Sequence, residues 1–118
     1  MPGAAIVRWE AREGVVLAVH GPFDGATAWS LRIEMEESPA RAFIVDLTHA
    51  VDACDFAASV MAWWARRWSR VKRVRFRPGT PEHARILAAH GLDLVEGDAP
   101  VPAGFVPPVP APGTGASA

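Results

Sequence analysis

The chain has 118 residues, a net charge of −1 and 50% hydrophobic residues. This length fits one domain, and this composition excludes a disordered chain. The near-neutral charge balance argues against a nucleic-acid-binding domain, because such domains are usually strongly basic. No apolar run approaches the roughly 18 residues of a membrane span, and the N-terminus has no signal-peptide pattern. The single cysteine excludes an internal disulfide and fits a reducing compartment, so we expect a cytoplasmic protein.

The chain begins with a predicted β-hairpin. Residues 5–10 and 15–20 are rich in valine, isoleucine and other apolar residues, as β-strands are. Residues 13–14 (Glu-Gly) carry a turn signal between them, so the two strands are expected to pair antiparallel. Residues 21–22 (Gly-Pro) are expected to end the second strand.

A first helix is predicted from Asp24, which can cap it, to about Glu37, and Pro39 stops it. Three apolar residues at spacings of three and four predict its buried face: Ala28, Leu31 and Met35. Its acidic residues are expected to be solvated: Glu34, Glu36 and Glu37.

Residues 43–47 predict a buried strand, and the polar turn 49–55 leads from it into a second helix. The strand has no polar alternation, which indicates burial on both faces of a sheet. Asp55 is the expected cap of a helix over residues 56–68. The residues expected on the core side of this helix are Phe56, Val60, Met61, Trp64 and Trp68.

The last elements are a strand and a helix. Residues 71–76 alternate apolar and basic side chains, which predicts a half-exposed strand near the edge of the sheet. Thr80 caps a helix with Pro81 at its first position, and Gly91 ends it. Residues 92–95 predict a short final strand.

The composition changes near the C-terminus, where the last 19 residues contain six prolines. We expect residues 98–118 to form a flexible or extended tail outside a domain of residues 1–97. The domain is predicted to be α/β, in the order β-β-α-β-α-β-α. Its mixed sheet of four to five strands is packed with helices, and only the first strand is expected to be antiparallel.

Three segments of the chain carry a family resemblance. Residues 15–24 are similar to a strand followed by Gly-x-(apolar)-Asp, residues 43–48 to a central strand ending in Asp-Leu-Thr, and residues 84–94 to a closing helix with a Gly-Leu step. In this order they resemble the STAS domain, the fold of bacterial anti-sigma-factor antagonists, over residues 5–96. The resemblance implies a STAS-like fold and a bacterial regulator that docks on an anti-sigma factor or a related ATPase or kinase by partner switching.

In that family the loop after the central strand commonly reads Asp-Ser-Ser-Gly, and a partner kinase phosphorylates its serine, which breaks the complex. With one extra residue in the loop, residues 55–58 correspond to this motif and Phe56 stands at the acceptor position. Without the extra residue, Cys54 stands at the position of the aspartate and Asp55 at the position of the serine. A carboxylate would then partly mimic the phosphorylated state. The expected cap at Asp55 and the helical stripe favour the first alignment. Neither leaves a hydroxyl, so no phosphorylation is expected at this position.

The resemblance places the docking surface on the loop 49–55 and on the exposed side of the following helix. Trp63 lies about 100° from Trp64 around that helix, so one of the two should reach the surface beside arginines, as in binding hot spots. Alternatively, Trp63 packs under the loop or against the tail. The residues expected to bind a protein partner are Thr48, His49, Asp52, Asp55, Phe56, Ser59, Trp63, Arg66 and Arg70.

Other functions have weaker support. The resemblance also allows an alternative function, a STAS subunit that binds the ATPase of an ABC lipid-transport complex. A weak homodimer is a further possible assembly. An enzyme is disfavoured, because the chain has no phosphate-binding glycine loop, no metal-site histidine spacing and no nucleophile motif. No catalytic residue, metal or cofactor is therefore expected. The basic run of residues 66–77 straddles a helix end, where arginine is favourable, so nucleic acid is not an expected partner.

Overall fold

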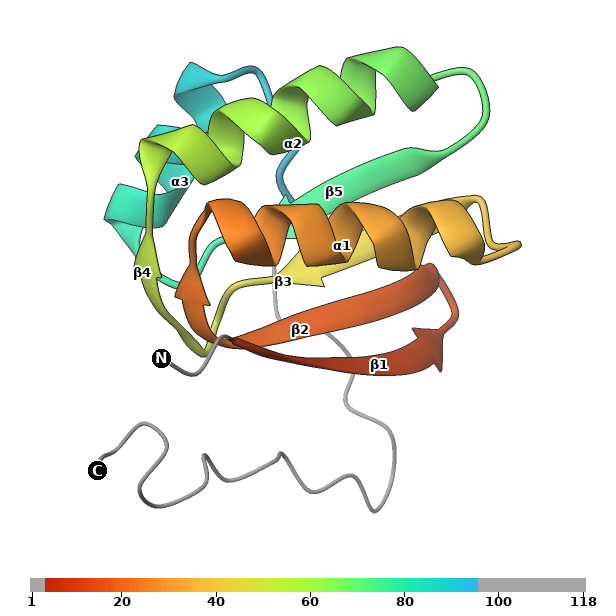
Figure 1. The fold of residues 1–118 in the computed structure, drawn as a ribbon, viewed down its shortest axis with the longest axis horizontal. Helices are drawn as coiled ribbons and strands as arrows, with labels where there is room; N and C mark the ends of the chain where they lie inside the picture. Colours follow the sequence, from red (N-terminus) through yellow and green to blue (C-terminus); the bar gives the residue numbers. More distant parts are fainter. Residues whose placement is uncertain (1–3, 96–118) are drawn as a thin grey trace.

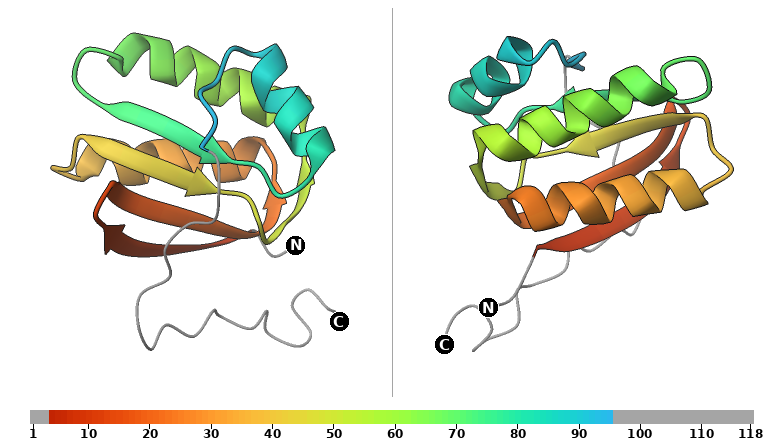
Figure 2. Two further views of the ribbon diagram at one scale, coloured as in Figure 1. Left: turned by 180° about the vertical axis from the view of Figure 1, so that it is seen from behind. Right: turned by 45° about the horizontal axis from the view of Figure 1, so that its top comes forward.

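The computed structural model describes residues 4–95, which build a mixed β-sheet with helices packed on one of its faces (Figures 1 and 2). The strands are β1 (Ala5–Ala11), β2 (Gly14–Phe23), β3 (Ala42–Asp46), β4 (Ala50–Ala53) and β5 (Arg73–Arg77). The helices are α1 (Gly25–Glu37), α2 (Asp55–Trp68) and α3 (Pro81–Ala89). The strand order is β1-β2-β3-β5, and β4 pairs with the end of β2. The expected tail, residues 98–118, lies outside the described residues.

The sheet has the expected directions. β1 and β2 form the predicted antiparallel hairpin, and β2, β3 and β5 run parallel to one another. Gly14 begins β2 with φ +137°, and a Cβ there would lie 2.4 Å from the carbonyl oxygen of Ala42. Glycine is therefore required where the hairpin turn passes the start of β3.

One strand was not predicted. Ala50–Ala53 forms β4 inside the segment expected to be only a polar turn, so the observed order is β-β-α-β-β-α-β-α. It exists because β2 does not end at residues 21–22: Gly21 takes φ +129° and the strand continues to Phe23. Gly21 then pairs with Ala50, and Phe23 with Ala53. A four-residue strand has too little alternation to be seen in a sequence.

The core lies between the sheet and the pair α1 and α2. Ala28, Leu31 and Met35 of α1 are buried as predicted, and the Asp24 side chain caps the helix by accepting from the amide of Thr27. Glu36 is not simply solvated, because it accepts hydrogen bonds from Trp64 Nε1 at 2.8 Å and Arg32 Nε at 3.0 Å. Burial alone would raise the pKa of Glu36, but these two hydrogen bonds lower it overall.

The start of α2 differs from the prediction, and its core face differs in part: Met61 and Trp64 are buried as predicted, Val60 and Trp68 are partly buried against the core, and Phe56 is not buried. Cys54, rather than Asp55, is the N-cap, and its sulfur accepts from the amide of Ala57. Phe56 is exposed, because a stripe with a spacing of four drifts about 40° per step around a helix. The buried residues instead follow spacings of three and four: Ala57, Ala58, Met61, Ala62 and Trp64.

The C-terminal part begins as predicted and then departs in two details. Thr80 caps α3, Pro81 is the first residue of the helix, and Gly91 follows its end with φ +76°. Residues 92–95 form a single bridge between Leu94 and Phe76 rather than a strand. Lys72 was expected in a half-exposed strand, but it precedes β5 and is buried, with its ammonium group donating to the carbonyls of Ser38 and Ala40.

Candidate protein-docking site

A groove runs between the exposed sides of α1 and α2, which lie next to each other in Figures 1 and 2. Its volume is about 380 Å³. The groove is lined by Gly25, Trp29, Arg32, Phe56, Ser59, Val60 and Trp63. We call this set the α1–α2 groove. It contains three of the nine residues that the sequence assigned to partner binding.

The groove exposes large aromatic side chains. Trp29 is 54% exposed, Phe56 64% and Trp63 48%. Trp64, the neighbour of Trp63, is fully buried, so the exposed tryptophan of this pair is Trp63. Three aromatic rings left in contact with water at one place are typical of a surface that binds another molecule.

Arginine side chains organise these rings. The guanidinium of Arg32 lies 4.6 Å from the ring centre of Trp29 and 5.6 Å from that of Trp63, so it joins the two helices. Arg67 lies 5.4 Å from the Trp63 ring. Glu36 partly neutralises Arg32 through a 3.0 Å ion pair. Stacked guanidinium groups reduce the freedom of the indole rings, which favours tight binding of a partner.

Phe56 closes one end of the groove by lying against the first residue of α1. A Cβ atom at Gly25 would stand 2.9 Å from Cε2 of the Phe56 ring. The absence of a side chain at Gly25 is therefore what lets the ring reach α1. Ser59 lies behind it, with a hydroxyl that donates to the carbonyl of Phe56 at 2.7 Å.

Asp55 connects the start of α2 to α3. One of its carboxylate oxygens lies 2.8 Å from Nε2 of His90. The Asp55 side chain is mostly exposed, and its place in the first turn of α2 is favourable for a negative charge. A carboxylate thus stands at the junction of the loop and the groove.

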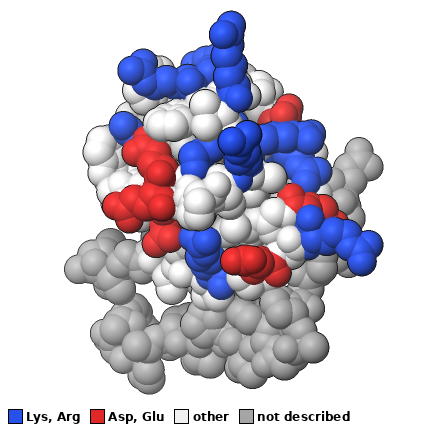
Figure 3. Space-filling model, turned by 90° about the vertical axis from the view of Figure 1, so that its right-hand side faces the viewer, with Lys and Arg blue, Asp and Glu red and all other residues white. Residues whose placement is uncertain are grey.

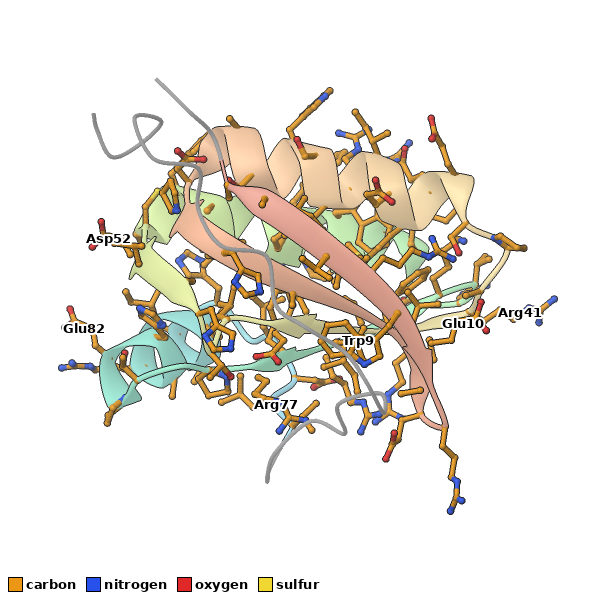
Figure 4. All side chains as sticks on the ribbon, turned by 90° about the horizontal axis from the view of Figure 1, so that it is seen from below. Trp9, Glu10, Arg41, Asp52, Arg77 and Glu82 are labelled. Carbon is orange, nitrogen blue, oxygen red and sulfur yellow. The ribbon has the colours of Figure 1, made fainter. Side chains whose placement is uncertain are left out.

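The other loop residues lie outside the groove. Thr48 and His49 are exposed, and the His49 ring stacks on His20 at 4.8 Å. Thr48 donates from its amide to the Asp46 carboxylate at 2.9 Å. Asp52 projects from β4 into solvent, where Figure 4 labels it. Of the nine predicted residues, three therefore lie in the groove, three in the loop and Asp55 between the two.

Two of the predicted residues lie outside the groove. Three residues that form its ring and cation contacts were not predicted: Trp29, Arg32 and Arg67. Arg66 and Arg70 are exposed but do not line it. The cations beside Trp63 are instead Arg32 and Arg67. Trp29 and Arg32 come from α1, where their spacing of three on the polar side of the predicted helix was the available signal.

The basic run of residues 66–77 does not make one positive surface. Lys72 and Arg77 are buried. Figure 3 shows the side of the molecule at the right of Figure 1, where lysine and arginine are interspersed with aspartate and glutamate. Within residues 4–95 no three His, Cys, Asp or Glu side chains are placed to hold a metal ion, and no helix has the length and apolar character to cross a bilayer.

Among the comparisons with known proteins, only the comparison with solved structures gives a match. No family model matches the chain, and no curated protein does. Among solved structures, the chain is similar to a serine-to-glutamate variant of RsbS from Moorella thermoacetica, with a TM-score of 0.55 and 16% identity. The likeness covers 75% of this chain and 79% of that one. Together with the strand order and the helix layer, it shows that this chain has a STAS-like fold.

Proposed function

We propose that this protein is a non-enzymatic regulatory module that binds a protein partner through the α1–α2 groove and the adjoining loop 48–55. The α1–α2 groove is the observation that carries the proposal. Trp29, Phe56 and Trp63 offer ring faces, and Arg32 offers a guanidinium between them. These groups recognise a surface by stacking and burial, whereas bond-making chemistry requires positioned acids, bases or nucleophiles.

The partner we propose is an anti-sigma factor or a related histidine-kinase-like ATPase, as in the family that the sequence resembles. The likeness to RsbS supports a partner-switching role only at the level of fold. The exposed Asp55 at the start of α2 gives the docking surface a fixed negative charge beside the aromatic groove.

We further propose that phosphorylation does not switch this protein at the usual position. Neither Asp55 nor Phe56 has a hydroxyl group. The two arguments for an extra loop residue were a cap at Asp55 and a buried Phe56, and the observed Cys54 cap and exposed Phe56 remove both. We therefore propose the alignment that sets Asp55 in place of the serine. Since no hydroxyl stands at this position, we propose that the complex is regulated by another route, such as partner abundance.

The test is affinity purification from the source cell followed by binding measurements on the captured ATPase. A histidine-kinase-like ATPase is expected with the wild-type chain. Trp63→Ala should weaken its binding at least tenfold while leaving the fold intact, because Trp63 is exposed. The matched control is Val71→Ala, an exposed apolar residue outside the groove, which should bind normally.

Three results would contradict the proposal in different ways. If Trp63→Ala and Val71→Ala lose binding equally, the groove is not part of the interface. Capture of an ABC ATPase with a membrane subunit would favour the lipid-transport alternative. Incubation with the captured kinase and ATP, followed by peptide mass spectrometry, should give no phosphate on residues 48–59, and a phosphopeptide there would overturn the view of the loop.

A further inference from the structure

The sheet has a second face, turned away from α1 and α2, and its central strands carry apolar residues there. The pairing register places Val7 opposite Ala18 and Trp9 opposite Val16 on the β1–β2 hairpin. Val16 in turn lies beside Ile44 of β3. We call this the outer face. Figure 4 views the molecule from this side.

The apolar residues on the two central strands of the outer face are buried, whereas Val7 and Trp9 on the edge strand β1 are half-buried. Val16 is 0% exposed, Ile44 1% and Ala18 2%. They do not belong to the core cluster that the helices share with the inner face. Among residues 4–95, the helices send their buried side chains to that inner core. The centre of the outer face is therefore shielded from water although no described helix lies over it.

Arg77 indicates that the cover is partly polar. It lies on the outer face of β5, opposite Asp46 of β3, and is only 6% exposed. Its Nε and Nη1 atoms find no hydrogen-bond partner within residues 4–95. A buried guanidinium without acceptors is unfavourable, so carboxylate or carbonyl oxygens from beyond these residues are needed beside it.

The described chain ends beside this face. Leu94 bridges to Phe76 in parallel, and the amide of Val95 donates to the Phe76 carbonyl at 2.8 Å. Val95 therefore lies along the free edge of β5, next to Arg77. The 23 residues that follow it, 96–118, start at the border of the outer face.

The sequence of this segment complements the outer face. It opens with Glu96 and Asp98, two carboxylates that can meet the arginines of β5, and its larger apolar side chains follow: Val101, Phe105, Val106 and Val109. Crossing the sheet from β5 to β1 spans three strand spacings, roughly 15 Å, or about five extended residues. The segment is therefore long enough to cross the whole face.

We propose that residues 96–118 fold back across the outer face of the sheet, with Glu96 and Asp98 at Arg77 and the apolar side chains over Val16 and Ile44. The prolines at positions 100, 102, 107 and 108 cannot donate to a β-ladder, so the segment covers the face with side chains rather than as another strand. Proline also restricts the backbone conformations of the undocked segment, which lowers the conformational entropy lost on docking. The C-terminal segment is then part of the domain rather than a spacer.

Truncation is the first test. A chain ending at Val95 should have a Tm lower by about 10 °C or more, because Val16 and Ile44 become exposed. The control lacks only residues 113–118, which carry no large apolar side chain, and should melt like the full chain. An unchanged Tm for the chain ending at Val95 would overturn the proposal.

A second measurement keeps the full chain and does not depend on the truncated one folding. A nitroxide is attached to Ala103→Cys in a Cys54→Ser background, since serine is a good N-cap, and the broadening of methyl signals is recorded. Val16, Ala18 and Ile44 should be broadened. Broadening confined to residues near Val95, or found at the α1–α2 groove, would contradict the proposal. In a mixture of an isotope-labelled chain without nitroxide and an unlabelled chain with nitroxide, broadening of these signals would show that a second copy covers the face. That result would also contradict the proposal.

Discussion

The α1–α2 groove and the outer face of the sheet both combine apolar side chains with arginine, yet they differ in contact with water. In the groove, Trp29, Phe56 and Trp63 are about half or more exposed. On the outer face, Val16 and Ile44 are buried almost completely. The groove is therefore free for another molecule, whereas the centre of the outer face is the part that we propose residues 96–118 to cover.

The difference shows that an apolar residue pattern does not by itself locate a docking surface. The side chains of both regions would be selected by any search for hydrophobic and basic residues. What separates them is the state of the arginines: in the groove Arg32 is stacked and paired with Glu36, while on the outer face Arg77 lacks partners within residues 4–95. An unsatisfied buried cation is unusual, and residues 96–118 would satisfy it in the cover that we propose.

The largest expected effect distinguishes the two neighbouring tryptophans. Trp64→Ala should lower the free energy of unfolding by about 3–5 kcal/mol, because it empties a fully buried site and removes one of the two donors of Glu36. Trp63→Ala should lower it by about 1 kcal/mol or less. Urea unfolding measures both. Similar losses would mean that Trp63 is part of the core and that the groove is not free.

The next effect tests the outer face. Ile44→Ala should cost about 2–5 kcal/mol of unfolding free energy, since its side chain is buried. Ile33→Ala, at an exposed position of α1, should cost about 0.5 kcal/mol or less. If Ile44→Ala behaves like Ile33→Ala in urea unfolding, the outer face is open and the contrast with the groove disappears.

A smaller effect concerns the start of α1, which forms one wall of the groove. Asp24→Ala should lower the free energy of unfolding by about 1 kcal/mol, because the side chain caps the amide of Thr27. That hydrogen bond lowers the pKa of Asp24. The stabilisation is therefore present above the ordinary aspartate pKa and is lost as the pH falls through the lowered value. Asp24→Asn keeps the cap and should lose this pH dependence in thermal melts between about pH 5 and 2.

The smallest effect is expected from His20, at the end of the outer face. Desolvation by burial, followed by the nearby His49, lowers the pKa of His20, while Asp46 opposes the shift. The folded state thus disfavours the protonated imidazole, so stability is full above the ordinary histidine pKa near 6.5 and falls as the pH drops below it. His20→Gln should flatten the Tm between pH 7 and 5. An NMR titration that finds His20 at or above its ordinary pKa would contradict this.

Most of the fold was predictable from the sequence because its signals are local. The cap at Thr80 with Pro81, the glycine at Gly91 and the spacing of Ala28, Leu31 and Met35 each indicate an element through two to four neighbouring residues. The strand β4 was missed because its pairing depends on an irregular end of β2, around Gly21, which no local pattern reveals.

The site was only half predictable for the same reason. The exposure of Trp63 follows from its angle on α2, but its partners Trp29 and Arg32 lie on another helix, and only tertiary packing brings the two together. The alternation in residues 71–76 likewise predicted exposed basic side chains. Lys72 is instead buried, because the turn after α1 offers its ammonium group the carbonyls of Ser38 and Ala40, and such a contact between distant segments is a property of the whole fold.

The pairing of β4 with β2 has a kinetic consequence for the partner binding that we propose. Ala50 and Ala53 are held by ladder contacts, and the amide of Cys54 donates to the Phe23 carbonyl at 3.1 Å. The loop that leads into α2 is thus shaped before any encounter. A partner then meets a surface that needs little further ordering, which reduces the entropy lost on association. Among variants of this surface, differences in affinity should therefore arise mainly from the lifetime of the complex rather than from the rate at which it forms.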